Sequence, residues 1–339
     1  MTEVRELDPR VDDLSGWTAV QAASLRADRP HDPVPPLQEV RAGALAGLPE
    51  RDPSERVRLL VAVQDGRAVG AARVELPLRD NTHLVYAEGH VLPDARRRGV
   101  GSALLQAALE RTEGRRLLAT DLDEPPHLAD ASPGRAFLRR HGYVEGLREI
   151  RRDLPLPVPA DRLDALEATA RERAGGYDVV AWRERCPDEL VEARAALGTV
   201  MSVDAPVGDM GWQQERWDAA RVREREQLLA EQGRSSVVAA ALHAATGELV
   251  AFTEVVVRTA DPAHAEQWET LVLQAHRGRR LGLLVKVEAL RRLVAEHPRT
   301  TSVSTTNADT NRWMIAVNEQ LGFTPNGLST SWQRPVGGP

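Results

Sequence analysis

The landmark residues in the first half of this 339-residue chain recur in the second half at a constant offset of 181 positions. The first set is Gly66, Val69, Glu88, Val91, Arg96 and Gly101, and the second set is Gly247, Val250, Glu269, Val272, Arg277 and Gly282. A fixed long offset indicates that one structural unit has been duplicated, and the period is too long for a solenoid. The sequence therefore predicts two copies of one domain.

A proline-rich segment marks the expected boundary between the copies. Residues 154–159 read Leu-Pro-Leu-Pro-Val-Pro, a pattern that favours an extended connector over a helix or a central strand. We expect a first domain at residues 1–153, a linker with a short helix at 154–176, and a second domain at 177–336.

The two halves show the same order of expected elements. In the first half, apolar runs flank a hairpin turn at Asp65-Gly66, a strand ends at Val91, and a helix follows from Gly99. In the second half, a hairpin turns at Thr246-Gly247 and the pattern repeats, ending with a strand at 302–305 and a helix at 311–320. Each half is therefore predicted to have a mixed α/β (α+β) fold.

Composition excludes several classes of protein. Cys186 is the only cysteine, so no internal disulfide is possible, and no cluster of ligands predicts a metal site. No apolar stretch is long enough to cross a membrane, and the first residues do not resemble a signal peptide, so we expect a cytoplasmic protein. The net charge of −6 argues against nucleic acid as a partner. Lys286 is the only lysine, which we interpret as the codon usage of a GC-rich genome.

A glycine loop between the strand and the helix of the first half predicts an anion site. The segment is Arg96, Arg97, Arg98, Gly99, Val100, Gly101 and Ser102, and its counterpart has Arg277, Gly278, Arg279, Arg280, Leu281 and Gly282. Glycines allow close approach of the backbone, and the first amides of a helix point toward whatever lies in front of them. A helix N-terminus beside arginines suits a pyrophosphate. Arg280 stands where the first copy has Gly99, so either it strains the loop or its side chain turns outward.

This loop, the preceding valine and the later pairs Gly142-Tyr143 and Gly322-Phe323 resemble the GCN5-related N-acetyltransferase (GNAT) superfamily, in a tandem two-domain form. The resemblance implies two domains, each with a mixed, mostly antiparallel sheet flanked by helices. It also implies acetyl-CoA as acyl donor, without a metal. The loop amides would take the pyrophosphate, and the strands at Val91 and Val272 would pair with the pantetheine arm.

Further site residues follow from the same resemblance. An asparagine commonly opens the later helix; the second copy keeps Asn311, whereas the first has Ala131. A tyrosine that often protonates the leaving thiolate is absent from both copies, because Leu138 and Asn318 stand at its position. Trp212 and Trp217 fall where the superfamily places its acceptor pocket, so they are candidates for contact with the substrate.

The reaction also needs a base, because an ammonium must lose its proton before it attacks a thioester. Glu269 and Glu88 lie three residues before the two valines and are the candidates; each could instead pair with an arginine. Strand alternation predicts Gln267, Glu269 and Leu271 on one face. Backbone N–H groups near Val272 would stabilise the developing oxyanion.

We therefore expect an N-acetyltransferase that moves an acetyl group from acetyl-CoA to a small-molecule or peptide amine by direct attack in a ternary complex. The second half is favoured for the chemistry, with the first binding the cofactor or serving structure. The alternative is a catalytically silent acetyl-CoA sensor or scaffold. The sequence does not predict the oligomeric state.

Overall fold

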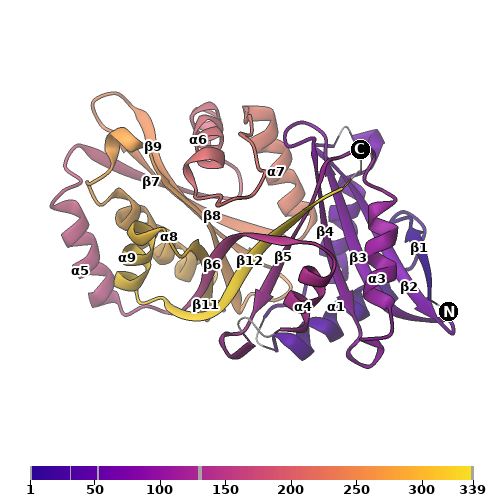
Figure 1. Ribbon diagram of the computed structural model, residues 1–339. Helices are drawn as coiled ribbons and strands as arrows, with labels where there is room; N and C mark the ends of the chain where they lie inside the picture. The colour runs from indigo at the N-terminus through magenta and orange to yellow at the C-terminus, as the bar shows by residue number, and fades with distance from the viewer. Residues whose placement is uncertain (1, 31, 52, 129–131, 337–339) are drawn as a thin grey trace. The chain divides into compact units, whose positions relative to one another are not determined.

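The computed structural model describes residues 2–30, 32–51, 53–128 and 132–336, and the chain divides into two compact units (Figure 1). Unit 1 comprises the described residues of Met1–Arg148, Val207–Gln213 and Leu328–Pro339. Unit 2 comprises Glu149–Pro206 and Gln214–Gly327. The units therefore differ from two contiguous halves, because residues 149–153 belong to unit 2, and residues 207–213 and 328–336 belong to unit 1.

Unit 1 is built on strands in the hydrogen-bonded order β1-β2-β3-β4-β5-β12. The strands are β1 (Glu3–Leu7), β2 (Glu55–Gln64), β3 (Arg67–Pro77), β4 (Leu84–Val91), β5 (Leu117–Glu124) and β12 (Thr324–Pro335), of which residues 328–335 pair with β5. The helices are α1 (Ser15–Asp28), α2 (Leu37–Ala46), α3 (Val100–Leu109) and α4 (Pro133–Arg140). Only the β4–β5 pair is parallel among the pairings described within this unit.

Unit 2 repeats this plan with strands in the order β6-β11-β10-β9-β8-β7. The strands are β6 (Val144–Pro155), β7 (Tyr177–Arg183), β8 (Arg234–His243), β9 (Glu248–Arg258), β10 (His264–Val272) and β11 (Ser302–Ala308). The helices are α5 (Ala160–Arg171), α6 (Val191–Asp204), α7 (Ala219–Glu231), α8 (Leu281–Glu296) and α9 (Arg312–Leu321). The predicted fold class, mixed α/β with a mostly antiparallel sheet, is confirmed in both units.

The two faces of the unit 2 sheet carry separate apolar clusters. One cluster joins α5 and α8 to the strands through Val255, Leu284 and Leu290. The other joins α6 and α7 to the opposite face through Phe252 and Leu197. Figure 1 shows α8 and α9 on one side of these strands and α6 and α7 on the other. Groups on the two faces can therefore meet only where the strands separate.

Several elements differ from the sequence-based expectations. α2 and β12 were not expected. α6 and α7 begin at Val191 and Ala219. β6 includes the first two residues of the proline-rich segment and ends at Pro155, which pairs with Ser302 at the start of β11. A proline is tolerated there because it ends the strand and no further ladder donor is needed.

The parallel strands separate soon after they begin to pair. β4 pairs with β5 only from Leu84 to Tyr86, although β4 continues to Val91. β10 pairs with β11 only from His264 to Gln267, although β10 continues to Val272. Each unit therefore has a wedge between its parallel strands, next to the helix that follows the glycine loop.

Candidate functional site

The glycine loop of unit 1 presents the uncapped N-terminus of α3. Gly99 is the N-cap residue with φ 85°, and no side chain caps the helix. Arg97 and Arg98 are exposed beside it. Arg96 turns away: its Nε donates to the Val91 carbonyl at 3.2 Å and its Nη1 to Asp28 at 2.7 Å. Arg96 thus ties the loop to the end of β4, while the helix amides and its two neighbours face solvent.

The loop of unit 2 keeps the same backbone despite Arg280. Arg280 is the N-cap residue of α8, with φ 58° and no side-chain cap. Its guanidinium turns outward and donates to the Thr169 carbonyl at 2.7 Å. Arg277 repeats the role of Arg96, donating to the Val272 carbonyl at 3.1 Å and binding Asp204. Of the two alternatives for Arg280 that the sequence left open, the side chain turns outward.

The first turns of α3 and α8 differ in what covers them. A Cβ on Gly101 would lie 3.2 Å from the Phe137 ring, and Ser102 Oγ lies 3.2 Å from His141 Nε2. A Cβ on Gly282 would meet only Val272 Cγ2, at 3.6 Å. The two glycines therefore have different neighbours, the Phe137 ring at Gly101 and Val272 at Gly282, and Gly282 is the more deeply buried of the two.

A β-bulge distinguishes the wedge of unit 2. The β10–β9 register shifts between Gln267 and Thr270, whereas the described β3–β4 ladder is continuous from Gly70 to Glu75. The bulge sends Gln267 to Thr253 Oγ1, at 2.8 Å, and Glu269 to the face of α6 and α7. The predicted common face for Gln267 and Glu269 is therefore wrong, because the extra residue breaks the alternation. Bulges are frequent beside active sites, where they redirect side chains and interrupt ladder pairing.

Glu269 lies between two arginines. Its carboxylate oxygens are 3.0 Å from Arg194 Nη2 and 3.2 Å from Arg225 Nη1. Arg225 also donates to Glu254 at 2.7 Å. Burial acts to raise the pKa of Glu269, but Arg225 and Arg194 outweigh it, so the pKa lies below its ordinary value. The carboxylate stays ionised at neutral pH and is a weaker base than an unpaired one.

Glu88 of unit 1 has a different partner. Its Oε1 lies 2.8 Å from His90 Nε2, and its side chain is 44% exposed. Of the two predicted bases, Glu88 is therefore paired with a histidine and Glu269 with two arginines.

The two predicted tryptophans fall in different units. Trp212 belongs to residues 207–213 of unit 1, where the carbonyl of its neighbour Gly211 accepts from His83 Nε2 and the Gly211 amide donates to Gln333 Oε1. Trp217 lies in unit 2, where the guanidinium carbon of Arg221 is 4.6 Å from its ring centre. Asn311 caps α9 by accepting from the Met314 amide at 3.2 Å, and Ala131 lies outside the described residues.

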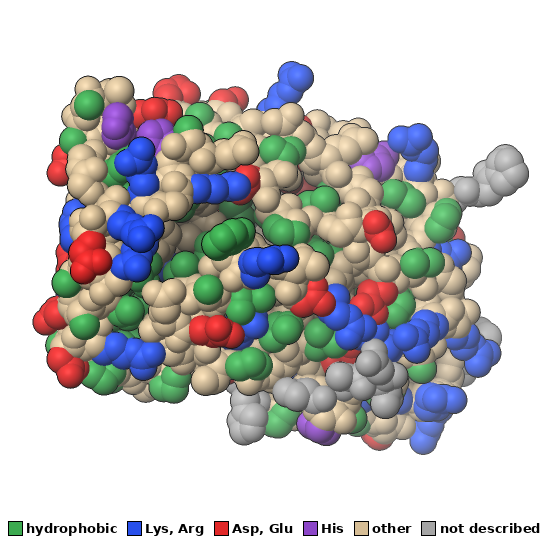
Figure 2. All heavy atoms as spheres, turned by 60° about the vertical axis from the view of Figure 1, so that its left-hand side comes forward, with side chains coloured by type: hydrophobic (Ala, Val, Ile, Leu, Met, Phe, Trp, Pro, Cys, Tyr) green, Lys and Arg blue, Asp and Glu red, His purple; other side chains and the backbone are tan. Residues whose placement is uncertain are grey.

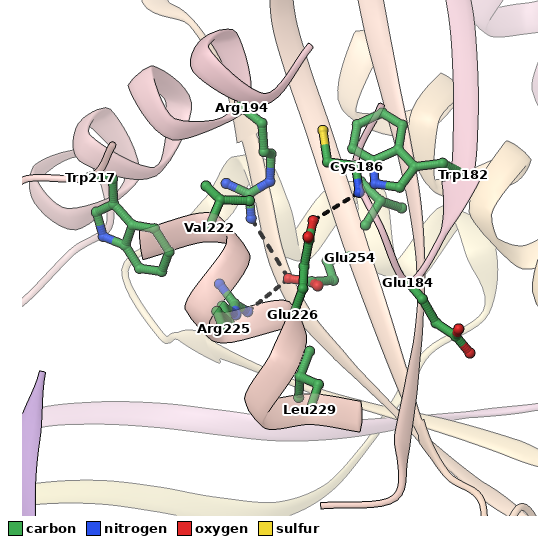
Figure 3. A pocket seen from close by; sticks show the side chains of 11 residues that line it. Trp182, Glu184, Cys186, Arg194, Trp217, Val222, Arg225, Glu226, Leu229 and Glu254 are labelled. Atoms are coloured by element: carbon green, nitrogen blue, oxygen red, sulfur yellow. Dashed lines mark hydrogen bonds and ion pairs between the residues drawn. The ribbon is translucent and has the colours of Figure 1, made fainter. Parts of the chain in front are cut away.

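A cavity on the α6 and α7 side of unit 2 is too small for a substrate (Figure 3). Its volume is ≈ 20 Å³, which suits about one water molecule. Figure 3 shows Arg194 and Arg225 converging on Glu254, with Cys186 and Trp182 beyond Glu226. Burial raises the pKa of the Cys186 thiol to about 11, so this cysteine is not a nucleophile at neutral pH.

Sequence analysis missed a buried polar cluster on the opposite face. Lys286 of α8 donates to Asn318 Oδ1 at 3.0 Å, and Asn318 Nδ2 donates to Asn307 Oδ1 of β11 at 2.6 Å. The signal in the sequence was the single lysine within the apolar run of α8, which we had attributed to codon usage.

The described residues show neither a metal-binding group nor a membrane-spanning helix. Within the described ranges, no three His, Cys, Asp or Glu side chains are grouped to hold a metal, and none of the helices is long and apolar enough to span a membrane. Figure 2 shows basic and acidic side chains interspersed over one face; the basic ones are arginines, because the lone lysine is buried.

Known proteins that resemble this chain carry GNAT domains. The family described as "Acetyltransferase (GNAT) domain" matches residues 55–145. A solved structure of a tandem GNAT protein from the clavulanic acid biosynthesis pathway matches 100% of both chains, at 27% identity and a TM-score of 0.79. Residues 55–145 therefore match a GNAT domain, as the sequence predicted, and the chain as a whole resembles a tandem GNAT protein.

Two further proteins resemble this chain over different lengths. The mycothiol acetyltransferase of Geodermatophilus obscurus is 35% identical over 183 residues, which cover 53% of this chain and 54% of that protein. The match thus spans about half the length of the curated relative. A GNAT protein from Sphaerobacter thermophilus shares the fold over 99% of this chain and 96% of its own, with a TM-score of 0.67 and 17% identity.

Proposed function

We propose that the protein is an acetyl-CoA-dependent N-acetyltransferase whose chemistry takes place in unit 2. The β-bulge at Gln267–Thr270 carries this proposal, because it lies where β10 leaves β11 and has no counterpart in the described β3–β4 ladder. A bulge leaves backbone groups outside the ladder, and such N–H groups can stabilise an oxyanion at a thioester carbonyl.

The loop of unit 2 supports binding of the coenzyme's diphosphate. Arg280 holds the left-handed conformation that glycine holds in unit 1, and a Cβ added at Gly282 would lie 3.6 Å from Val272 Cγ2. A strained non-glycine residue persists only where its surroundings maintain it, often at a functional site. The amides at 281–282 and the partial positive charge of the helix would meet the diphosphate.

The acceptor is proposed to be a small-molecule or peptide amine that reaches the wedge from the α6 and α7 side. Glu269 faces that side and stays ionised, so it can accept a hydrogen bond from an incoming amine and assist loss of its proton. The relative from Geodermatophilus is named for mycothiol, and a thiol-bearing amine of that class belongs in the acceptor panel.

The experiment is a calorimetric titration with acetyl-CoA, followed by thiol-release assays over a panel of small-molecule and peptide amines. Gly282→Leu places a bulky side chain on the first turn of α8, where the diphosphate is proposed to bind, and should abolish release. Leu283→Met, a volume-conserving change in the core, is its control. Release that survives Gly282→Leu contradicts the assignment to unit 2.

A silent coenzyme-binding protein is the second candidate. The pairing of Glu269 with Arg194 and Arg225 favours it, because this pairing lowers the basicity of the carboxylate. Tight binding of acetyl-CoA without thiol release for any amine would support that candidate.

A further inference from the structure

Lys286 is the only lysine of the chain, and it is buried. Its exposed fraction is 1%, and its Nζ lies 5.6 Å from the centre of the Phe323 ring. Asn318 Oδ1 is the one hydrogen-bond acceptor that the described residues offer to this amine. A protonated amine has three donors, so most of its hydrogen-bonding capacity is unused.

Among the residues that the structure describes, none supplies a counter-charge to Lys286. α8 packs against α5, α9 and strands β7 to β10. The acidic residues of α5 that reach α8, Asp164 and Glu167, bind Arg291. His276 bonds to Tyr177, and on α9 the group facing the amine is the neutral Asn318. Burial alone therefore lowers the pKa of Lys286, to about 7.

An arginine could not serve at this position. A guanidinium keeps its charge in proteins, whereas a buried amine can release its proton. The chain uses arginine for every other basic side chain of the Lys/Arg type. A lysine in this one buried place therefore provides the property that arginine lacks, a proton that exchanges near neutral pH.

Unit 1 shows that the fold does not require this cluster. Lys286 lies four residues after Gly282, and Leu105 lies four after Gly101. Asn318 lies four residues before Gly322, and Leu138 lies four before Gly142. Asn307 is five residues past the strand partner Ser302, as Leu122 is past Leu117. Three buried or half-buried leucines thus replace the polar set in unit 1.

The polar set lies at the wedge. Lys286 is one turn below Gly282 on the same face of α8. Asn307 is on β11 beyond Thr305, the last residue that pairs with β10. The set therefore borders the gap on the α8 and α9 side, across the sheet from Glu269.

We propose that Lys286, oriented by Asn318 and Asn307, supplies the proton to the departing thiolate in unit 2. This inference rests on the proposed function. When the amine nitrogen bonds to the acetyl carbon, the carbon–sulfur bond breaks and its electron pair goes to sulfur. The Lys286 ammonium gives one proton to that sulfur and becomes a neutral amine, and it regains a proton from water. The proton lost by the acceptor nitrogen leaves on the Glu269 side.

The test uses the intact protein labelled with [15N]lysine, in which a single Nζ signal reports on Lys286. The signal is titrated with pH alone, with coenzyme A, and with desulfo-coenzyme A, which lacks the sulfur. We expect a midpoint near 7 for the protein alone. Coenzyme A should shift the midpoint, because its sulfur becomes a direct neighbour of the Lys286 amine. Desulfo-coenzyme A should leave it in place.

The two proposals fail in different ways. A protein that shows no calorimetric binding of coenzyme A contradicts the proposed function. Bound coenzyme A with the same Lys286 midpoint as desulfo-coenzyme A contradicts the proton donor alone.

Kinetics give a second readout. Lys286→Met should lower kcat about 10²-fold and remove the fall in kcat above pH 7, while the KM for acetyl-CoA stays within about threefold. Leu105→Met, at the matching position of unit 1, is the control and should keep the wild-type pH profile. A wild-type pH profile in Lys286→Met would overturn the role.

Discussion

Arg280 and Gly99 occupy the same place in their loops with the same left-handed backbone, at φ values of 58° and 85°. For a residue with a Cβ this conformation costs about 1–2 kcal/mol. The Arg280 guanidinium recovers part of that cost by donating to the Thr169 carbonyl. Arg280 is therefore strained at a position where unit 1 has the unstrained Gly99.

Because of this strain, glycine and alanine at position 280 should differ in their effect on stability. Arg280→Gly and Arg280→Ala both remove the bond to Thr169, so their difference isolates the backbone. We expect Arg280→Gly to be more stable than Arg280→Ala by about 1 kcal/mol in urea unfolding. Gly99→Ala should be destabilising by a similar amount. Equal stability of the two Arg280 variants would show that the residue is not strained.

Thr253 should hold the bulge together. Its hydroxyl bonds to the Glu269 carbonyl at 2.9 Å, to Thr270 Oγ1 at 2.7 Å and to Gln267 Nε2 at 2.8 Å. Thr253→Val keeps the shape but leaves these buried groups without their partner, so we expect a loss of about 1–3 kcal/mol. Thr305→Val, which removes one bond to the Gln267 carbonyl, should cost less. Urea unfolding of both variants checks this order.

Glu269 should stabilise unit 2 in a pH-dependent way. Its pKa is lowered in the folded state, so its contribution is present above the ordinary carboxyl pKa and is lost as the pH falls through the folded value. Glu269→Gln should be less stable than wild type by about 1–3 kcal/mol at pH 7. The difference should shrink in acid. Glu248→Gln, at a side chain that is 54% exposed, should stay within about 0.5 kcal/mol of wild type.

Lys286 should also make the stability of the fold rise with pH, but at higher pH than Glu269 does. Its pKa falls from 10.5 to about 7 on folding, so the unfolded chain holds the extra proton between these values. The free energy of unfolding should therefore rise with pH across that window, by about 1.4 kcal/mol per unit relative to Lys286→Met. Unfolding of both proteins at pH 7, 8 and 9 measures the difference. A constant difference would mean that the amine is charged in the folded protein.

Cys186 should resist thiol reagents until the protein unfolds. Its side chain is 1% exposed and burial raises its pKa to about 11. N-ethylmaleimide at pH 7 should add less than a tenth of an equivalent to the native protein and one equivalent in urea, as read by mass spectrometry. Fast labelling of the native protein would show that the small cavity opens.

The local part of the architecture could be predicted from sequence. The repeat at 181, the hairpins at Gly66 and Gly247 and the loops before α3 and α8 depend on turn chemistry and on short-range patterns. The pairing of β6 with β11 and of β12 with β5 depends on contacts between strands far apart in sequence, which periodicity does not encode.

The site shows the same limit. The position of Glu269 beside the wedge followed from its spacing to Val272, but its two arginine partners come from α6 and α7. The bulge depends on a register shift that alternation alone cannot reveal. The sequence showed that Lys286 is the only lysine, but its burial and its hydrogen bond to Asn318 were apparent only in the structure.

The most direct measurement is a crystal structure of the protein soaked with saturating acetyl-CoA. We expect the diphosphate against the first amides of α8 and the thioester between β10 and β11, with its sulfur on the Lys286 side. Coenzyme bound only at residues 96–102, with the α8 loop empty, would contradict it.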